Sequence, residues 1–323
     1  MRRRSLLPLL LFSLTLCAQA GCPLRGQLQR ILQKAKAQVG VAVIIDGKDT
    51  LTFHNEAHYP LMSVMKFHQA LAVAHHLEQH HLPLSAPVRI EEQELLPGTY
   101  SPLRDRYPKG GITLSVGELL AYTLQQSDNN ACDILFNYIG GTSVADRYIR
   151  SLGVDSFAIS ATEDDMHRHP EQCYANWSSP LATACLMDRL AAGTLPIDTS
   201  YTRFIHKTLL GCQTGKERLP APLQGTQARI GHKTGTSGQN GKGEWTAIND
   251  AGFVLLPDGR RYAIAVFVMH AQTSLQEAEK IIADISAMVY RHLAGNTCNF
   301  LPASGATCQQ IPYICHELQT KAL

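Results

Sequence analysis

Ser63-Val64-Met65-Lys66 stands at the head of an apolar run with helical spacing, which continues through Phe67, Leu71, Ala74 and Leu77. The pattern predicts that Ser63 lies near the N-terminus of a helix, with Lys66 one turn later on the same face. An ammonium beside a hydroxyl, together with the positive end of the helix dipole, favours negative charge developing near the serine. The stretch therefore predicts a serine nucleophile that needs no histidine.

Two further sets of residues support this hypothesis, because one Ser-x-x-Lys is expected by chance roughly once in a chain of this size. Ser127-Asp128-Asn129 falls in a turn between helical stretches, where it could face a cleft or simply cap a helix. Lys233-Thr234-Gly235 ends a predicted strand, where a glycine lets a ligand approach the backbone closely, although a plain turn is the alternative. The order and separation of the three sets indicate a single site.

Together the three sets resemble those of the class A serine β-lactamases, in the penicilloyl-serine transferase superfamily. The resemblance covers the chain from about Gln27 to about Ala294. An acidic residue follows the Ser-Asp-Asn serine by about 36 positions in that family, and Glu163 stands there. The resemblance implies a hydrolase that opens the β-lactam amide of penicillins and cephalosporins through an ester on Ser63, confers antibiotic resistance, and needs no metal or organic cofactor.

The same resemblance implies roles for individual side chains. The implied catalytic residues are Ser63, Lys66, Ser127 and Glu163. The implied substrate-binding residues are Asn129, Lys233, Thr234, Gly235, Thr236 and His167. Ser127 would relay a proton to the leaving nitrogen, and Glu163 would hold the hydrolytic water. Lys233 and Thr234 would bind the substrate carboxylate, while the backbone N–H of Thr236 would complete an oxyanion hole with that of the nucleophile.

The polar stretch around Glu163 corresponds to the omega loop of the family but departs from its common pattern. Ala161 stands where most relatives have arginine, Asn176 where they have aspartate, and His167 where they have asparagine. Both ends of the family's loop ion pair are therefore replaced, and the loop must be held differently, with Asn176, Trp177 and His167 as candidates. This departure resembles a branch that leans toward cephalosporins.

The order of secondary-structure patterns predicts the fold. A helix at 24–39 and hairpin strands at 41–45 and 50–54 come first, and helical patterns fill 63–210. Strands return at 228–234, 246–256 and 261–269, followed by a helix at 274–293. We predict an α/β fold of the α+β type, with an antiparallel sheet of about five strands, terminal helices packed on it and an all-helical insertion. This agrees with the β-lactamase/transpeptidase-like fold that the resemblance implies.

These patterns divide the chain into three regions. Residues 1–20 form a predicted signal peptide, 21–294 the catalytic unit, and 295–323 a cysteine-containing tail. Within the catalytic unit, 21–57 and 212–294 make the sheet part and 58–211 the helical part. We expect the ligand pocket at the seam between these two parts.

The N-terminus has the basic, apolar and small-residue order of a secretory signal, from Arg2-Arg3-Arg4 to Ala18-Gln19-Ala20. It predicts cleavage after Ala20 and a periplasmic location. A lipid anchor at Cys22 is the alternative, which we disfavour because Gln19 stands where a lipobox carries leucine. No later run is apolar and long enough to span a bilayer.

The cysteines, the histidines and the net charge indicate which disulfides, metal sites and partners to expect. Eight of the nine cysteines follow the signal, and we expect disulfides among Cys298, Cys308 and Cys315 and buried thiols at Cys132 and Cys185. Histidines crowd the helix at 68–81, but imidazoles near a helix C-terminus fit the helix dipole more simply than a metal ion, so we predict no metal site. A net charge of +2 without a dense basic block gives no reason to expect nucleic acid, and we expect a monomer.

Two other functions share these motifs. A penicillin-binding DD-peptidase acts on cell-wall peptides and deacylates β-lactams slowly, and Glu163 at the family spacing disfavours it. A β-lactam sensor domain stays acylated and normally follows a membrane-spanning part. Turnover of a chromogenic cephalosporin beyond one equivalent separates the hydrolase from both.

Overall fold

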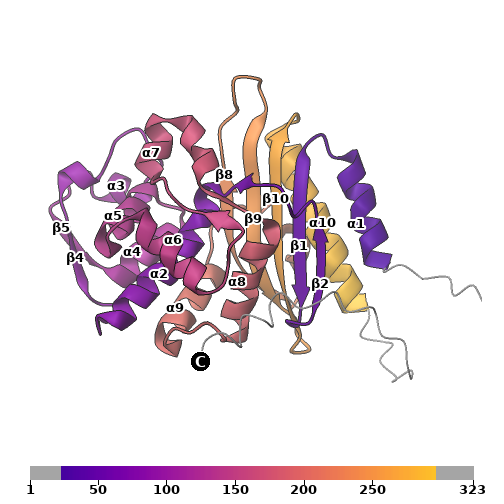
Figure 1. Cartoon of the computed structure of the whole chain (residues 1–323), viewed down its shortest axis with the longest axis horizontal. Helices are drawn as coiled ribbons and strands as arrows, with labels where there is room; N and C mark the ends of the chain where they lie inside the picture. Colours follow the sequence, from indigo (N-terminus) through magenta and orange to yellow (C-terminus); the bar gives the residue numbers. More distant parts are fainter. Residues whose placement is uncertain (1–22, 296–323) are drawn as a thin grey trace, which may run out of the picture.

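The computed structural model describes residues 23–295, and two distant segments of the chain meet in one sheet (Figure 1). The strand order is β2-β1-β10-β9-β8, with every neighbouring pair antiparallel. The strands are β1 (Gln38–Ile45), β2 (Asp49–Phe53), β8 (Arg229–Thr236), β9 (Trp245–Leu255) and β10 (Arg261–Ala271). The predicted five-stranded antiparallel sheet is confirmed.

The helices form two groups. A terminal pair consists of α1 (Pro23–Lys34) and α10 (Leu275–Gly295). The others lie between β2 and β8: α2 (Met65–Gln79), α3 (Pro102–Arg106), α4 (Val116–Gln125), α5 (Asn129–Ile139), α6 (Thr142–Ser151), α7 (Glu163–Arg168), α8 (Pro180–Ala192) and α9 (Thr199–Leu210). Short 3-10 turns are η1 (Met62–Val64), η2 (Glu92–Glu94), η3 (Pro170–Ala175) and η4 (Ala221–Leu223).

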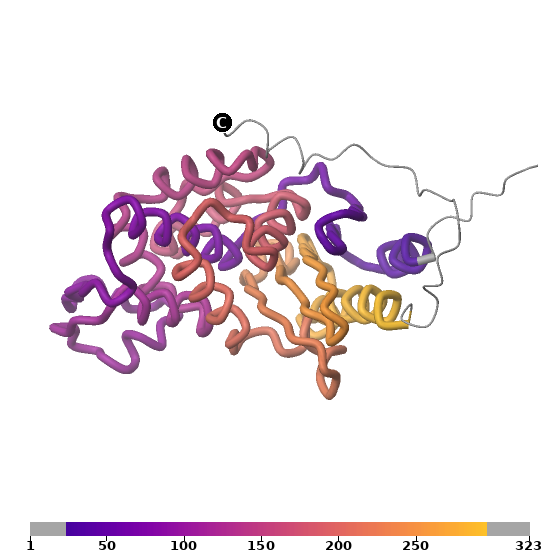
Figure 2. The backbone as a smooth tube through the Cα atoms, turned by 90° about the horizontal axis from the view of Figure 1, so that it is seen from below, coloured from indigo at the N-terminus to yellow at the C-terminus, as the bar shows by residue number. Residues whose placement is uncertain are grey.

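Each face of the sheet has its own hydrophobic core. Along β1, Val41 and Val43 pack in the core formed with the terminal helices, whereas Ala42 and Ile44 pack in the core shared with the helical part. Helix α8 lies against β1 and β10 on the second face. Because both faces are covered, β9 and β10 are buried along most of their length. Figure 2 shows the terminal helices and the helical part at opposite ends of the molecule, with the sheet between them.

The insertion is mainly helical, but the prediction that it is all-helical is wrong. It contains a three-stranded sheet in the order β3 (Tyr59–Pro60), β7 (Trp177–Ser178) and β6 (Phe157–Ala158). It also contains the pair β4 (Pro87–Ile90) and β5 (Ile112–Ser115). Strands of two to four residues are too short for an alternating pattern to be visible in the sequence.

The first helix is shorter than predicted, because it ends at Lys34 and β1 begins at Gln38. Residues 38–45 pair with β10 from Met269 to Tyr262, so strand pairing takes over the end of the predicted helix.

Helix α2 forms the centre of the helical part. Every residue from Met65 to Ala74 is buried, as expected of a helix surrounded by other elements. The polar members of this stretch are accommodated individually: Gln69 donates to the Cys132 carbonyl at 2.7 Å, and burial lowers the pKa of His68 to about 4. Among the described residues, none of these histidines belongs to a group of three or more metal-ligating side chains.

The segment from 159 to 179 is organised around the buried side chain of Asn176. Its Oδ1 accepts from the backbone N–H of Ser160 at 2.8 Å and of Ala161 at 2.9 Å, and its Nδ2 donates to the Ala161 carbonyl at 2.8 Å. Its own carbonyl accepts from the Leu61 N–H at 2.8 Å, beside the turn that carries Ser63. Of the three candidates for holding this loop, Asn176 therefore makes the contacts that close it.

The same segment is less irregular than its composition suggests. Thr162 and Asp165 form a capping box that starts the short helix α7. Trp177 stacks on His58, with ring centroids 3.4 Å apart, and so ties the end of the loop to the start of the helical part. The motif Thr162-x-x-Asp165 is the sequence pattern that indicates the start of this helix.

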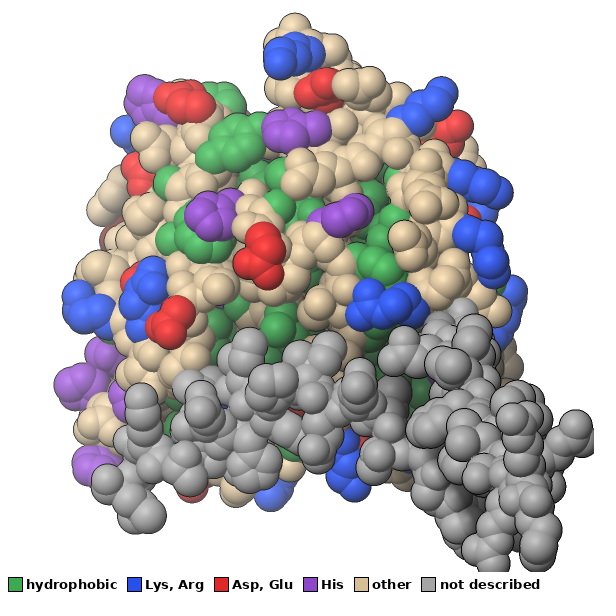
Figure 3. All heavy atoms as spheres, turned by 45° about the vertical axis from the view of Figure 1, so that its right-hand side comes forward, with side chains coloured by type: hydrophobic (Ala, Val, Ile, Leu, Met, Phe, Trp, Pro, Cys, Tyr) green, Lys and Arg blue, Asp and Glu red, His purple; other side chains and the backbone are tan. Residues whose placement is uncertain are grey.

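The cysteine predictions are confirmed where the structure describes them, because Cys132 and Cys185 are both buried. The proposed disulfides among Cys298, Cys308 and Cys315, the signal peptide and Cys22 lie outside the described residues. Within residues 23–295, no helix combines the length and apolarity needed to cross a bilayer. On the face drawn in Figure 3, acidic and basic side chains are scattered rather than gathered by sign.

Asn176→Ala should lower the free energy of unfolding by at least about 2 kcal/mol, because the backbone groups of Ser160 and Ala161 would lose their partner. The matched control is Asn137→Ala on the exposed face of α5, expected within about 0.5 kcal/mol of the parent. Urea unfolding measures both. Equal stabilities of the two variants would contradict the role given to Asn176.

Gly40→Ala should also destabilise the protein, by about 1–3 kcal/mol, because a Cβ on this residue of β1 would lie 2.5 Å from the buried ring of Tyr59. Gly26→Ala is the control, since no atom lies within 4 Å of its Cβ position in α1 and alanine favours a helix. Thermal unfolding should lower the midpoint of the first variant alone. An unchanged midpoint for Gly40→Ala would show that Tyr59 can move aside.

Candidate active site

Ser63 lies in the 3-10 turn η1, which leads directly into α2. This turn packs against strands β8 and β9 of the sheet. Met62 before it has a left-handed backbone with φ 47°, a conformation that the surroundings must impose on a residue with a side chain. Asn249 of β9 donates to the Leu61 carbonyl at 3.3 Å. A Cβ on Gly235 would lie 2.4 Å from that carbonyl oxygen, so only glycine lets β8 approach the turn.

The structural reason for a glycine at position 235 therefore differs from the predicted one, which was the close approach of a ligand to the backbone. Its open side faces the turn that carries Ser63, so the absence of a side chain serves packing between β8 and η1 rather than the approach of a ligand. Any contact between this residue and a substrate would have to use its backbone.

Lys66 lies at the centre of the site, with a fully buried side chain whose ammonium is surrounded by oxygen atoms. It donates to the Ser63 hydroxyl at 3.0 Å, the Ser127 carbonyl at 2.8 Å and the Asn129 amide oxygen at 2.6 Å. Oε1 of Glu163 lies 2.9 Å from the same nitrogen. A buried cation requires such compensation, and the carboxylate supplies the opposite charge.

The hydroxyl of Ser63 lies between this cation and this anion. It accepts from Lys66 and donates to Oε1 of Glu163 at 3.3 Å. The Glu163 carboxylate is thus a base within reach of the serine proton, and the ammonium favours the negative charge that follows its removal. The arrangement is that of an activated nucleophile.

The Ser-Asp-Asn set divides between the cleft and the helix cap. Asp128 caps α5 by accepting from the Ala131 N–H at 2.8 Å, so the helix-cap alternative applies to this residue. Ser127 has a left-handed backbone with φ 62°, and its hydroxyl accepts from Lys233 at 2.9 Å. Asn129 binds Lys66 as described above. Ser127 and Asn129 therefore face the site.

Lys233 approaches Ser127 from the opposite wall. Burial, followed by the charge of Lys66, lowers the pKa of Lys233 to about 7. Its ammonium also donates to the Thr234 carbonyl at 2.8 Å. The Thr234 hydroxyl lies 2.6 Å from that of Thr214, outside the Lys-Thr-Gly set. This wall presents a cation and hydroxyl groups, which suits an anionic group of a ligand.

These residues surround a cleft of about 350 Å³. Its lining comprises Met62, Ser63, Thr99, Tyr100, Ser127, Asn129, Glu163, Met166, His167, Thr214, Thr234 and Thr236. Of the ten predicted site residues, seven line the cleft, while Lys66 and Lys233 are buried beside it and Gly235 lies behind it. The structure thus brings all ten into one neighbourhood.

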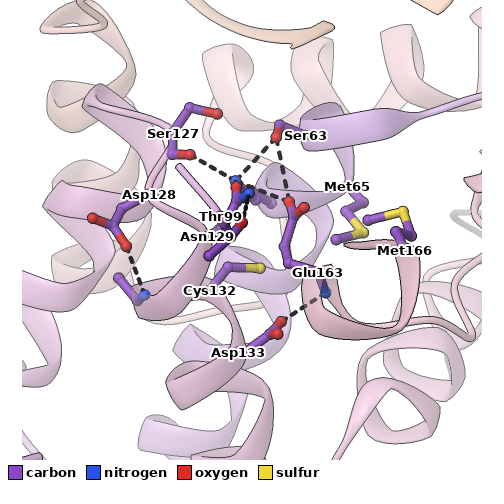
Figure 4. A network of polar contacts seen from close by, with 12 residues as sticks. Ser63, Met65, Thr99, Ser127, Asp128, Asn129, Cys132, Asp133, Glu163 and Met166 are labelled. Atoms are coloured by element: carbon purple, nitrogen blue, oxygen red, sulfur yellow. Dashed lines mark hydrogen bonds and ion pairs between the residues drawn. The ribbon is translucent and has the colours of Figure 1, made fainter. Parts of the chain in front are cut away.

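Asp133 is a residue that the sequence analysis missed. One carboxylate oxygen accepts from the Glu163 N–H at 2.8 Å (Figure 4), and the other accepts from the Asp164 N–H at the same distance. This contact anchors the N-terminus of α7 to α5 and so fixes where Glu163 stands. Burial raises the pKa of Asp133 to about 7 despite these two bonds. Its position one turn after Asn129, on the same helix, was the only sequence signal.

Arg218 and Thr99 were also missed. The buried guanidinium of Arg218 donates to the Gly235 carbonyl at 3.1 Å and to the Thr236 hydroxyl at 2.7 Å, which holds the end of β8. Thr99 accepts from the Asn129 amide nitrogen at 2.7 Å, so the oxygen of that amide points at Lys66. Both residues come from loops without periodicity, where sequence patterns give no indication of burial.

Known β-lactamases share sequence with this chain over most of its length. A model of the Beta-lactamase enzyme family matches residues 23–293. A β-lactamase of Bacteroides uniformis is 42% identical over 84% of this chain and 92% of its own length. Beta-lactamase VEB-1 of Pseudomonas aeruginosa is 35% identical over 82% of this chain and 89% of its own.

Solved structures give the same result. A class A β-lactamase from Bacteroides cellulosilyticus DSM 14838 is 40% identical, with a TM-score of 0.81 over 84% of this chain and 97% of that one. The TLA-1 extended-spectrum β-lactamase is 38% identical, with a TM-score of 0.81 over 84% of this chain and 98% of that one. The sequence and fold relationships together show that this chain belongs to the class A β-lactamases.

Proposed function

We propose that Ser63, Lys66, Ser127 and Glu163 carry out the hydrolysis of β-lactam antibiotics, the activity that follows from class A membership and that confers resistance. The observation that carries these assignments is the contact of one buried ammonium with the Ser63 hydroxyl and the Glu163 carboxylate, at 3.0 and 2.9 Å. The protein is a serine hydrolase that forms and then breaks an ester.

Acylation begins when the Ser63 oxygen attacks the carbonyl carbon of the β-lactam ring. Glu163 accepts from this hydroxyl and can take its proton directly, whereas Lys66 can take it only after passing a proton of its own to Glu163. The charge that develops on the carbonyl oxygen is bound by the backbone N–H groups of Ser63 and Thr236. When the ring amide breaks, Ser127 passes a proton to the leaving nitrogen. The Lys233 contact at 2.9 Å keeps its hydroxyl in place.

Deacylation needs a water molecule activated against the ester. Glu163 lines the cleft, is 8% exposed and contacts Ser63, so its carboxylate can hold and deprotonate a water near the ester carbon. Asp133 and Asn176 set the position of this carboxylate through the backbone of the loop.

Substrate recognition uses the wall formed by β8. Lys233, Thr234 and Thr236 bind the carboxylate of penicillins and cephalosporins, and Asn129 binds the side-chain amide of the substrate. His167 lies on the opposite rim, in α7, where it can contact the variable side chain. VEB-1 and TLA-1 resemble this chain, and TLA-1 is described as an extended-spectrum enzyme. We therefore infer that cephalosporins are among the substrates.

The cellular setting is inferred from the sequence. The residues up to Ala20 have the composition of a signal peptide, and we propose that the mature protein works in the periplasm without a lipid on Cys22. Among the described residues, the large apolar side chains that are exposed are Tyr100 and Tyr174, which supports a monomer.

Lys66→Ala should abolish most acylation, because the variant loses the cation and proton acceptor at 3.0 Å from the Ser63 oxygen. We expect the acylation rate to fall by about 10²–10⁴-fold. Stopped-flow kinetics with a chromogenic cephalosporin measure it. Lys109→Ala, at an exposed position, is the matched control. Acylation at the wild-type rate in the Lys66 variant would exclude its role.

Glu163→Gln should separate the two chemical steps. Lys66 and the oxyanion hole remain, so the variant should still acylate, whereas hydrolysis of the ester should slow by about 10²–10⁴-fold. Mass spectrometry should show a stable adduct on Ser63 of the intact protein. This outcome also distinguishes the hydrolase from a DD-peptidase or a sensor domain, in which the parent protein itself would stay acylated.

The control for this variant is Glu171→Gln, which removes an exposed carboxylate from the same loop. It should turn over the chromogenic cephalosporin like the parent. If Glu163→Gln also turned over normally, the general base would have to be reassigned, with Asp164 and Asp165 as the next candidates.

A further inference from the structure

A second set of reactive side chains lies directly behind the carboxylate-binding wall. His232 precedes Lys233 on β8, and because successive strand residues point to opposite faces, its ring lies on the far side of the strand from the cleft. The ring is 3% exposed, and its Nδ1 lies 2.9 and 3.1 Å from the two oxygens of Asp250. Asp250, on β9, is fully buried and also accepts from the Leu219 N–H at 3.2 Å.

Cys212 completes this set from the loop after α9. His232 is the side chain with the strongest influence on its thiol, and the residue is partly exposed at the surface. Because Nδ1 lies against Asp250, Nε2 is the ring nitrogen left to act on the sulfur. The order carboxylate, imidazole, thiol is the one that converts a cysteine into a nucleophile. None of these three groups has a part in the β-lactam reaction described above.

The charges around Cys212 favour the thiolate. Burial alone would raise its pKa, but the hydrogen bond and charge of His232, together with Lys233 and Thr214, bring the pKa of Cys212 down to about 7. Burial would lower the pKa of His232, yet Asp250 and Cys212 outweigh it and raise that pKa to about 10. The proton is thus held on the ring while the sulfur is negative.

The other thiols offer a contrast within the same molecule. Burial raises the pKa of both Cys132 and Cys173, and no imidazole contacts either thiol. Cys132 also faces the negative charges of Glu163 and Asp133. The set does not form a metal site, since the described residues contain no suitable group of three ligands.

We propose that Cys212 is a covalent modification site for small thiol-directed electrophiles, activated by His232 and Asp250, and that an adduct there disturbs recognition of the substrate carboxylate. With a haloacetamide the thiolate sulfur attacks the methylene carbon, a C–S bond forms, the carbon–halogen bond breaks and halide leaves with the bonding pair. The thiol proton stays on His232 and is exchanged with water. Disulfides would react by the same displacement at sulfur.

The route from this thiol to the cleft is short. The Cys212 sulfur lies 3.5 Å from the Thr214 hydroxyl, which in turn lies 2.6 Å from the Thr234 hydroxyl. Gly215, which follows Thr214, also packs closely against Thr234. A Cβ on Gly215 would lie 2.4 Å from Cγ2 of Thr234. We expect a group added to the sulfur to shift Thr214 and, through it, Thr234.

The labelling experiment uses the full mature protein, iodoacetamide and peptide mapping by mass spectrometry. Near pH 7, Cys212 should be alkylated at least about tenfold faster than Cys132 or Cys173, and its rate should level off above pH 7 rather than rise toward the ordinary thiol pKa of about 8.5. His232→Gln should remove this fast phase. Cys173→Ser is the matched control and should keep it.

The kinetic experiment tests whether alkylation of Cys212 affects substrate binding in the cleft. Only this experiment rests on the proposed function. Alkylation of the parent should raise KM for a carboxylate-bearing cephalosporin severalfold with a smaller change in kcat. The Cys212→Ser variant should be insensitive to the reagent.

The labelling and kinetic experiments test two separate parts of the proposal. Alkylation of Cys212 no faster than that of Cys132 would overturn the activation by His232, whatever the activity of the enzyme. Fast alkylation that leaves KM unchanged would overturn the coupling to Thr234. If His232→Gln is unfolded by circular dichroism, Asp250→Asn provides the same test, and unchanged labelling in that variant refutes the three-residue set.

Discussion

The burial of one ammonium group governs the architecture of this protein. Lys66 cannot lie inside α2 unless oxygen atoms surround it, because an uncompensated charge in the interior costs several kcal/mol. Those oxygens come from the turn before α2, from the start of α5 and from the loop at α7. Each of these segments must be positioned accurately to satisfy the lysine, so the same requirement that stabilises the interior also assembles the catalytic groups.

The assembly of the catalytic groups also requires strained backbone conformations at two turns. Met62 and Ser127 both adopt left-handed backbone conformations, which cost of order 1–3 kcal/mol for residues with side chains. Met62 precedes the nucleophile, and Ser127 is itself used in the chemistry. Both are held by contacts from β8, through Gly235 in one case and Lys233 in the other. The rigid sheet and the buried helix supply the stability that keeps these two turns in place.

The sequence was sufficient to predict the five-stranded sheet and the ten residues gathered at the site, because long apolar strands and spaced motifs leave a clear pattern. It could not reveal the two small sheets, whose strands are too short to show a period. It also missed Asp133 and Arg218, since a charged residue in a helix or loop looks the same in sequence whether it is exposed or buried. The meaning of Gly235 was misjudged for a similar reason, as only three-dimensional contacts show which neighbour occupies the space beside it.

The order of strands in the sheet also bears on how the chain reaches its native state. Gln38 pairs with Met269, so the first strand of the sheet gains its second neighbour only when the last strand has been made. Contacts this distant in sequence slow folding and leave an N-terminal fragment without a complete core. A nascent chain of this design cannot complete its sheet until β10 has been made. That delay is an advantage for any polypeptide that must thread through a narrow translocation channel before it folds.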